Sequence, residues 1–449
     1  MPKKNKSNFV CNNCGSISSS WSGKCLQCGE WNTITEQIDT LSVAGSSSTG
    51  RILSSQTLNQ SIKSDNKRLV SGIKEIDDVL GGGIVAGSIN LIAGQPGIGK
   101  STILLQLANK IASQEATLYI SGEESAHQIG LRAKRLGAAS NKLNIVTSNS
   151  ADDIAATIAE GNTKLVIVDS IQTLSCSAIS SAAGTVSQIT NSTQLITMAA
   201  KKSDTAVIIV GHVTKEGYIA GPKVLEHAVD VVLQLEGDRY GGFKLLRAIK
   251  NRFGSTSETG IFEMNESGLQ PVKNPSAALL SERQVSDGSI VLATMEGTRP
   301  LLVEVQALVN RTNYGYPKRA ASGFDLNRLN LLIAMLERRS KLKLAEYDIY
   351  INIVGGIQIK EPAADLAICL AIGSAAKGLQ LNKNLVVFGE IGLSGEVRHV
   401  PYMERRLEES KKLGFEGAIG PRSSGSKKIA GLNSVTDVRS SLNQFLDKD

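Results

Sequence analysis

The middle of the chain alternates short apolar runs with stretches of helical periodicity. The end of one buried strand lies at residues 91–93, and further runs of strand length lie at 116–125, 164–170 and 205–214. After the first run, apolar residues recur at the spacing of one helix face as far as residue 111. Apolar strands separated by helices are typical of a parallel sheet that is buried on both faces. The pattern predicts an α/β core with a mostly parallel sheet.

The segments before and after these strands also show the periodicity of helices and strands. Residues 72–80 have helical spacing and end at a glycine turn, and residues 229–238 and 243–254 read as a strand hairpin. After about residue 271, alternating strands are followed by helical patterns at 326–344 and 361–378. This mixture predicts a separate α+β domain at the C-terminal end.

Residues 40–66 are rich in Ser, Asn and Gln and show little apolar periodicity, which is typical of a linker. We therefore predict four parts: a small N-terminal module at 1–35, a linker at 36–66, the α/β core at 67–270 and the α+β domain at 271–449.

A phosphate-binding motif lies between the first core strand and its helix. Residues 94–101 read GQPGIGKS and match the pattern G-x-x-x-x-G-K-[ST] at every fixed position. Glycines let the backbone approach phosphate oxygens, and the helix N-terminus adds a positive dipole. An ordinary glycine-rich turn is the alternative, but the strand and the helix on either side favour a nucleotide site. The predicted ATP-binding residues are Gly94, Gln95, Pro96, Gly97, Ile98, Gly99, Lys100, Ser101 and Thr102.

Acidic residues follow two of the other predicted strands. Ser101 and Asp169 are predicted to hold Mg²⁺, because ligands in open α/β sheets bind at the carboxyl ends of the strands. Either Glu123 or Glu124 is predicted to polarise the attacking water. His212 ends the fourth strand, where it is predicted to sense the γ-phosphate. Helix capping or surface charge is the alternative for the carboxylates, and a satisfied polar residue is the alternative for His212.

Four of the six cysteines are gathered near the N-terminus as two C-x₂-C pairs, Cys11, Cys14, Cys25 and Cys28. Two such knuckles can complete a tetrahedral shell of four sulfurs around Zn²⁺ and leave no position open for catalysis. Disulfides and a redox C-x-x-C are the alternatives, and both are disfavoured in a cytoplasmic ATPase with two such pairs. Cys176 and Cys369 stand in apolar surroundings and are predicted to be buried.

Composition adds a few limits. The formal net charge is +7, which is compatible with nucleic acid but is weak evidence alone. No apolar run approaches the length of a membrane span, and the N-terminus leads into no signal-like region, so we expect a cytoplasmic protein without a membrane partner. Segments 175–190 and 214–224, the latter with Lys215 and Lys223, follow strand ends and are predicted to be mobile loops, and their basic and small residues are compatible with holding a nucleic-acid backbone.

Together the four-cysteine ribbon, the RecA-type core, the motif KNRFG and the C-terminal region resemble the bacterial RadA (Sms) family. The motif comprises Lys250, Asn251, Arg252, Phe253 and Gly254. The resemblance implies a hexameric, DNA-stimulated ATPase. It would drive branch migration on single-stranded and branched DNA alongside the RecA recombinase. It also implies that Lys250 and Arg252 complete a neighbouring subunit's nucleotide site, or else contact DNA phosphates.

The C-terminal region resembles the proteolytic domain of Lon, a Ser/Lys peptidase. In the matching stretch Ala363 occupies the position of the serine, and the lysine falls near Glu404. A Ser/Lys dyad needs a hydroxyl and an amine, so an active protease is not expected. We expect an assembly and DNA-binding platform, with a surface that includes Arg299, Arg311, Lys318 and Arg319.

One alternative from another functional class remains open. An ATP-gated signalling or scaffold protein of the circadian-clock ATPase type shares the same core and would hydrolyse ATP without translocating on DNA.

Overall fold

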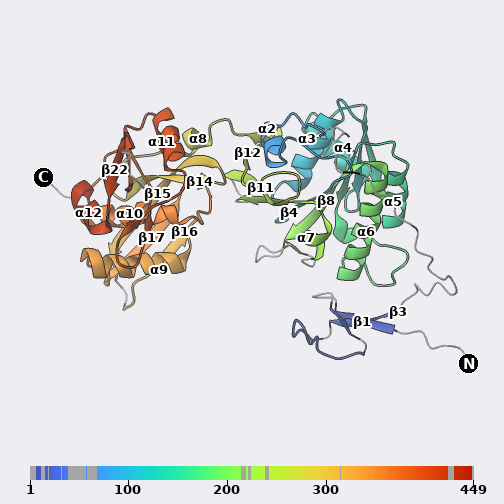
Figure 1. The fold of residues 1–449 in the computed structure, drawn as a ribbon, viewed down its shortest axis with the longest axis horizontal. Coiled ribbons are helices and arrows are strands. Elements are labelled where there is room, and N and C mark those ends of the chain that lie inside the picture. Colours follow the sequence, from blue (N-terminus) through green and yellow to red (C-terminus); the bar gives the residue numbers. More distant parts are fainter. Residues whose placement is uncertain are drawn as a thin grey trace, which may run out of the picture. The chain divides into compact units, whose positions relative to one another are not determined.

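The computed structural model describes residues 7–11, 16–18, 20–31, 33–38, 57, 68–213, 219–220, 224–237, 242–313, 315–422 and 429–446. Figure 1 shows the chain as a ribbon. It divides into two compact units. Unit 1 comprises residues 1–236, 245–256 and 264–270, and unit 2 comprises residues 237–244, 257–263 and 271–449. The predicted domain limit at residue 270 stays a prediction. Among the described residues, no helix has the length and apolarity needed to cross a membrane.

The N-terminal module is a three-stranded sheet in the order β2-β1-β3. Its strands are β1 (Ser7–Cys11), β2 (Ile17–Ser18) and β3 (Ile34–Ile38). Because β3 pairs with β1 as far as Ile38, the module continues past the limit of residue 35 that the sequence predicts. The predicted linker beyond it lies almost entirely outside the described residues.

The large sheet has the order β13-β12-β11-β10-β4-β8-β7-β5-β6, with β9 paired to β8. The strands are β4 (Ile89–Gly94), β5 (Thr117–Ser121), β6 (Leu143–Thr147), β7 (Leu165–Asp169), β8 (Ala206–Val213), β9 (Ile219–Ala220), β10 (Val231–Gly237), β11 (Phe243–Asn251), β12 (Thr259–Asn265) and β13 (Gly268–Pro271). The helices are α2 (Lys74–Val79), α3 (Lys100–Ile111), α4 (Ala126–Arg135), α5 (Ala151–Ala159), η1 (Ile171–Thr173), α6 (Val186–Ser203) and α7 (Val224–Ala228). The run from β10 through β4 to β6 is parallel, as predicted.

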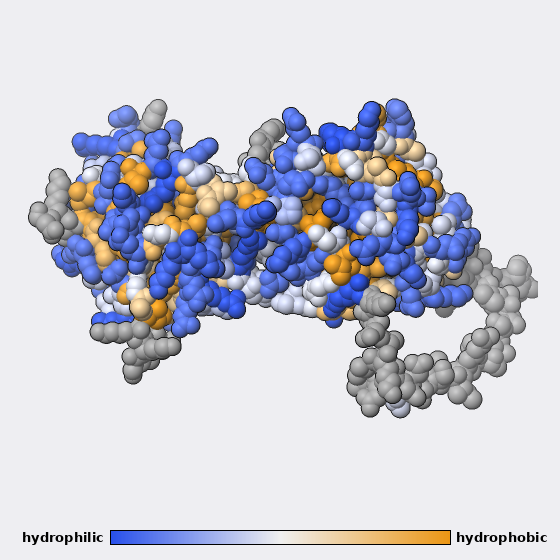
Figure 2. Space-filling view, turned by 90° about the horizontal axis from the view of Figure 1, so that it is seen from above, coloured by the Kyte–Doolittle hydropathy of each residue, from blue (hydrophilic) through white to orange (hydrophobic). Residues whose placement is uncertain are grey.

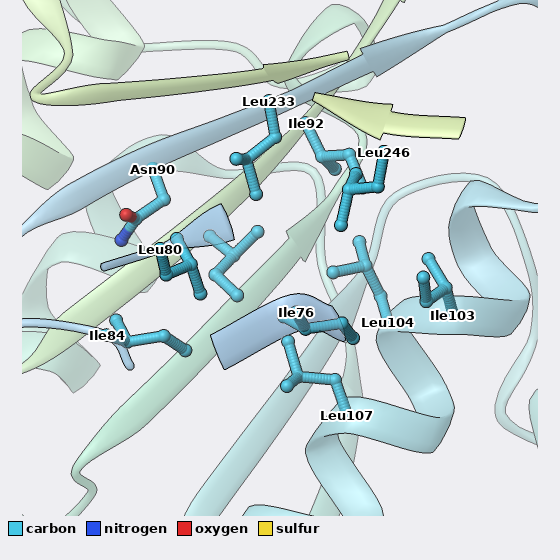
Figure 3. A pocket seen from close by; sticks show the side chains of 11 residues that line it. Ile76, Leu80, Ile84, Asn90, Ile92, Ile103, Leu104, Leu107, Leu233 and Leu246 are labelled. Atoms are coloured by element: carbon cyan, nitrogen blue, oxygen red, sulfur yellow. The ribbon is translucent and has the colours of Figure 1, made fainter. Parts of the chain in front are cut away.

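Helices cover both faces of this parallel sheet. Alternate residues of β4 point to opposite sides, so Ile89 and Leu91 pack into the cluster that contains α5 and α6. On the other side Ile92 faces α2 and α3, and Figure 3 shows the apolar side chains that meet there. Since β4 is buried along its whole length, its carboxyl end is held rigidly at the sheet edge.

One polar side chain interrupts that second face. Asn90 lies beside the apolar side chains in Figure 3. Its Nδ2 donates to Ser88 Oγ at 2.9 Å and to the Val207 carbonyl at 3.1 Å. Its Oδ1 is buried and has no partner among the described residues. The cavity at this place measures only about 10 Å³, which is about the room that one water needs.

Unit 2 contains a seven-stranded mixed sheet in the order β16-β17-β15-β14-β18-β21-β22 and a small ribbon of β19 and β20. The strands are β14 (Ser289–Glu296), β15 (Arg299–Arg311), β16 (Arg319–Ser322), β17 (Tyr347–Ile353), β18 (Leu385–Val387), β19 (Glu390–Ile391), β20 (Val397–Arg398), β21 (Gly417–Pro421) and β22 (Leu432–Val435). The helices are α8 (Pro275–Leu280), α9 (Leu326–Met335), η2 (Leu336–Ser340), η3 (Pro362–Ala364), α10 (Asp365–Lys377), α11 (Met403–Lys412) and α12 (Val438–Leu446). On the face drawn in Figure 2, hydrophilic residues predominate and apolar residues are scattered among them.

A buried ion pair anchors α11 to the sheet of unit 2. Arg406 is almost fully buried and donates to both carboxylate oxygens of Glu361, at 2.8 and 2.7 Å. Its Nη1 also donates to the Ala293 carbonyl at 2.6 Å. Glu361 accepts from Thr294 Oγ1 and from the Met295 amide. Every charge in this cluster therefore has partners, which is the condition for a buried pair to be tolerated.

Replacing Arg406 with Ala should destabilise unit 2 by about 3–5 kcal/mol, because Glu361 then loses its counter-charge in a mostly buried place. Urea unfolding of the full chain, followed by far-ultraviolet circular dichroism, measures the shift. The neighbouring Arg405 is exposed, and Arg405→Ala should change the free energy of unfolding by no more than about 0.5 kcal/mol. Equal shifts for the two variants would contradict the anchoring role.

Candidate active site and metal centre

The loop between β4 and α3 contains two glycines with no room for a side chain and one that faces open space. A Cβ atom on Gly94 would lie 2.7 Å from the Leu235 carbonyl oxygen, and one on Gly99 would lie 2.8 Å from Met264 Cε. Gly97 and Gly99 adopt positive φ angles of 78° and 115°. A Cβ on Gly97 would meet nothing within 4 Å. The loop thus wraps tightly on its protein side and leaves its outer side open, which suits close approach of phosphate oxygens.

Lys100 begins α3 and folds back over this loop. Its Nζ donates to the carbonyls of Gly94 and Gln95 at 2.8 and 3.1 Å. Burial lowers the pKa of Lys100, and the nearby charges of Asp169 and Glu123 act in the opposite direction. One cation and two carboxylates are therefore close enough to interact electrostatically.

Asp169 ends β7 beside Ser121 of β5, and a tyrosine holds its carboxylate. The Tyr119 hydroxyl donates to Asp169 Oδ2 at 2.6 Å. Tyr119 is buried, and burial together with the Asp169 charge raises the pKa of its hydroxyl well above the usual 10.0. The hydroxyl therefore remains a donor at neutral pH, and the other carboxylate oxygen is left for a different ligand. The sequence gives only a weak sign of Tyr119, a residue with a polar tip between Leu118 and Ile120 of its strand.

The two glutamates after β5 have different partners. Glu123 Oε1 accepts from Ser170 Oγ at 2.5 Å, so it lies directly beside the residue that follows Asp169. Glu124 forms an ion pair with Arg132 of α4, whose first turn is fixed by a Ser125–Gln128 capping box. Glu123 is thus bound to the residue after Asp169, and its charge acts on Lys100. Glu124 is tied to the helix that follows, and its charge acts on Tyr119.

His212 lies at the carboxyl end of β8, where its backbone is in register with Gly94. His212, the predicted sensor of the γ-phosphate, is therefore level with the start of the phosphate loop. Its side chain lies outside the described part of the chain.

The KNRFG segment ends β11. It is bound near the amino end of β4, whereas the phosphate loop follows the carboxyl end of that strand. Lys250 Nζ donates to the carbonyls of Glu226 and Val229 at 2.6 and 2.8 Å. Arg252 forms an ion pair with Asp230 at 3.1 Å, and Asp230 also accepts from the amide of Ile89, the first residue of β4. Arg252 keeps 53% of its side chain exposed. Asn251 Oδ1 accepts from the Phe253 amide, the Phe253 carbonyl accepts from Arg68, and Gly254 packs against Gly81.

The expectation of a long mobile loop at 175–190 is wrong in part. Helix α6 begins at Val186, with the Thr185 side chain as its N-cap. Buried Gln188 accepts from the Cys176 amide at 2.7 Å and donates to the carbonyls of Ile179 and Ser181, both at 2.9 Å. This single side chain ties the preceding loop to the helix, and composition alone gives no sign of it. Lys215 and Lys223 of the second predicted loop lie outside the described residues.

The cysteines of the N-terminal module form a cluster. The sulfurs of Cys11, Cys25 and Cys28 lie within 4.8 Å of one another, and those of Cys11 and Cys28 are 3.7 Å apart. Four sulfurs at about 2.3 Å from a tetrahedral zinc ion are separated by about 3.8 Å, so the spacing fits this metal. A disulfide would require about 2.05 Å. The hydroxyls of Thr33 and Ser16 contact the sulfurs of Cys11 and Cys25, and such contacts orient the ligands of a zinc ion. Cys14 lies outside the described residues.

Replacing Cys25 with Ser should release the zinc, because a hydroxyl binds Zn²⁺ much more weakly than a thiolate and the small module depends on its metal. Metal analysis of the purified full chain by mass spectrometry measures zinc per chain. Cys176→Ala is the matched control, since Cys176 is buried in the core of unit 1 instead, and it should retain zinc. Full zinc content in the Cys25 variant would contradict the site.

In unit 2 the Lon-like positions do not form a dyad. Ala363 is buried in the core with Phe388 and Met403, and Glu404 is exposed in the first turn of α11.

Of the predicted basic surface, Arg311 is paired with Glu346, and the Lys318 amide binds Asp348. Cys369 is buried, and burial raises the pKa of its thiol.

Comparison with known proteins covers all three parts of the chain. The family model described as KaiC, an ATPase, matches residues 69–270. The model described as rubredoxin metal binding domain matches residues 9–36, and the one described as subunit ChlI of Mg-chelatase matches residues 328–424.

Whole-length relatives decide the family. The DNA repair protein RadA of Aquifex aeolicus is 44% identical over 94% of this chain and 94% of its own. RadA of Bacillus subtilis is 47% identical over 93% of both chains, and RadA of Escherichia coli is 43% identical over 98% of this chain and 99% of its own. The chain belongs to the RadA family.

The resemblance and the fold class that the sequence predicts are thereby confirmed. The chain combines a zinc ribbon, a RecA-like ATPase core with a mostly parallel sheet, and a C-terminal Lon-like domain, as in the RadA family. Its cofactors are ATP with Mg²⁺ in the core and Zn²⁺ in the ribbon. A solved RadB recombinase also matches 46% of this chain, with 21% identity and a TM-score of 0.36, and adds nothing to this assignment.

Proposed function

We propose that the chain is a DNA-dependent ATPase and helicase that drives branch migration of recombination intermediates in homologous recombination and DNA repair. It would act in the cytoplasm on single-stranded and branched DNA, together with the RecA recombinase. The names of the relatives support the DNA repair role. The observation that carries the ATPase is geometric: β4, β5 and β7 run parallel, so the glycine loop with Lys100, Glu123 and Asp169 all lie at the carboxyl ends of these strands.

We propose a role for each residue at the carboxyl ends of these strands. The amides of the glycine loop and Lys100 would bind the phosphates, with Lys100 leaving the carbonyls of Gly94 and Gln95. Ser101 and Asp169 would hold Mg²⁺, which neutralises the charge on the transferring phosphoryl group. Tyr119 would keep the Asp169 carboxylate in its orientation.

Glu123, rather than Glu124, is proposed to orient the attacking water. Its carboxylate accepts a hydrogen bond from Ser170, the residue after Asp169, and its negative charge acts on Lys100. Glu124 has its charge neutralised by Arg132 and is left as a positioning residue for α4.

Lys250 and Arg252 are proposed to act on the nucleotide of a neighbouring subunit in a homo-hexamer. Asp230 binds both Arg252 and the amide of Ile89, which begins β4, whereas the phosphate loop begins where β4 ends at Gly94. Five residues of strand separate these points by roughly 17 Å. Arg252 therefore lies too far along the sheet to reach its own subunit's phosphates, while its exposed side chain is available to another subunit or to DNA phosphates.

For unit 2 we propose an assembly and DNA-binding platform without peptidase activity. The buried Ala363 and the exposed Glu404 support the absence of peptidase activity, because neither supplies the hydroxyl or the amine of a dyad.

An assay on a labelled three-stranded DNA joint tests the motor directly. The full-length chain with ATP and Mg²⁺ should move the branch point and release the displaced strand. Lys100→Ala should bind the same joint without moving it. Hydrolysis without branch movement would favour the ATP-gated scaffold, a reading that the KaiC match of the core also supports.

A further inference from the structure

Both tryptophans of the chain are exposed, and both lie in the zinc ribbon. Trp21 and Trp31 expose 63% and 66% of their surface. Leu26, between the cysteines of the second knuckle, exposes 95%. Tryptophan is highly buried on average in folded proteins. A small module that presents both of its indole rings to solvent is therefore a candidate binding surface.

The cysteine knuckle fixes the position of the second ring. Lys24 and Trp31 form an antiparallel bridge across the knuckle that carries Cys25 and Cys28. The Cys25 amide donates to the Glu30 carbonyl at 2.9 Å, and the Gly29 amide donates to the Cys25 carbonyl at 2.9 Å. Trp31 is thus attached to a turn that the metal would hold rigid.

A glycine separates the two rings. A Cβ atom on Gly23 would lie 3.8 Å from Cζ3 of Trp31 and 3.9 Å from Cη2 of Trp21, in van der Waals contact with both. Both rings therefore border one backbone position that has no side chain. Lys24 Nζ lies 5.6 Å from the centroid of the Trp31 ring, which adds a cation to the same surface.

The chemistry of this surface matches unpaired nucleobases on a phosphate backbone. Aromatic faces bind bases by stacking without regard to sequence, and a neighbouring lysine binds phosphate. The segment of residues 1–31 carries Lys3, Lys4, Lys6 and Lys24 against Glu30, so its charge favours an anionic partner. In a duplex the base faces are covered by their neighbours, which leaves single-stranded DNA as the form that can stack.

We propose that the Trp21–Trp31 surface of the ribbon stacks bases of single-stranded DNA, with Lys24 on an adjacent phosphate. The proposal deepens the DNA-dependent function by naming a contact and the form of DNA it takes. It does not depend on the ATPase site.

Intrinsic tryptophan fluorescence reports on this surface alone, because the chain has two tryptophans and both are here. The zinc-loaded full chain should lose emission as a thymidine homopolymer is added, with saturation at the same concentration as the anisotropy of a labelled copy of that oligonucleotide. An abasic deoxyribose-phosphate polymer of equal length should bind without quenching, and duplex DNA should quench far less. Binding by anisotropy without any change in emission would overturn the proposal, as would equal quenching by the abasic polymer.

Variants test the rings themselves at one fixed salt concentration. Trp31→Ala and Trp21→Ala should each weaken binding of the homopolymer on the order of 5- to 100-fold, and the Phe variants should retain most of it. Zinc content of each variant verifies that the ribbon is folded. A zinc-loaded Ala variant that binds as tightly as the native chain would overturn the proposal.

The two proposals fail separately. Quenching should persist in Lys100→Ala, where hydrolysis is lost. If DNA quenches the native chain but does not stimulate its hydrolysis, the ribbon contact stands and the proposed function does not. If DNA stimulates hydrolysis without quenching, the ribbon contact alone is overturned.

Discussion

Glu123→Gln is expected to lower kcat for ATP hydrolysis by about 10²–10⁴-fold, the usual contribution of a general base. The amide keeps an oxygen that accepts from Ser170 Oγ, so the local structure should be retained. It removes the negative charge that attracts the proton of the attacking water. ATP binding, measured with a fluorescent analogue, should therefore change little. The expected signature is a loss of kcat with a nearly unchanged dissociation constant.

Glu124→Gln is the matched control, one residue further along the chain. It removes an ion pair with Arg132 and leaves Lys100, Glu123 and Asp169 in place, so kcat should fall less than about tenfold. The reverse order, with Glu124→Gln inactive and Glu123→Gln active, would contradict the assignment. Equal losses would mean that the two carboxylates act together.

Arg252→Ala is expected to lower hydrolysis by about 10³-fold, the lower end of the range for an arginine finger. Because the residue is proposed to act on the neighbouring subunit, the loss should be repaired by mixing. Lys100→Ala subunits cannot hydrolyse ATP but still carry Arg252. In a mixed ring they would complete the sites of Arg252→Ala subunits, so two inactive preparations should regain activity together.

Arg247→Ala is the control for this experiment. Arg247 lies in the same strand, β11, and forms an ion pair with Glu236 at 2.5 Å. Its loss should leave hydrolysis nearly unchanged. If Arg252→Ala loses only the stimulation by DNA and mixing restores nothing, Arg252 contacts DNA instead.

The sequence predicts most of the fold because its strongest signals are local. Short apolar runs such as residues 165–168 favour strands of a sheet that is buried on both faces, and the glycine loop follows one of them. Two cysteine pairs likewise define a metal cluster without knowledge of the fold. These features depend on spacing within one segment.

What the sequence does not show are contacts between segments that are distant in the chain. Tyr119 and Asp169 are fifty residues apart in the chain, and Glu123 accepts a hydrogen bond from Ser170, 47 residues further on. Gln188 looks like any polar residue of a loop until Cys176, Ile179 and Ser181, its three hydrogen-bond partners, are placed around it. Arg252 lies near the amino end of β4, away from the phosphate loop. This position depends on the direction of the strands, which no motif encodes.

ATP hydrolysis by the purified full-length chain, measured with and without single-stranded DNA, decides whether this protein is a DNA-dependent motor. We predict strong stimulation by DNA that falls as salt is raised, because contacts to phosphates release counterions. Hydrolysis at the same rate with and without DNA would contradict it and favour an ATP-gated scaffold.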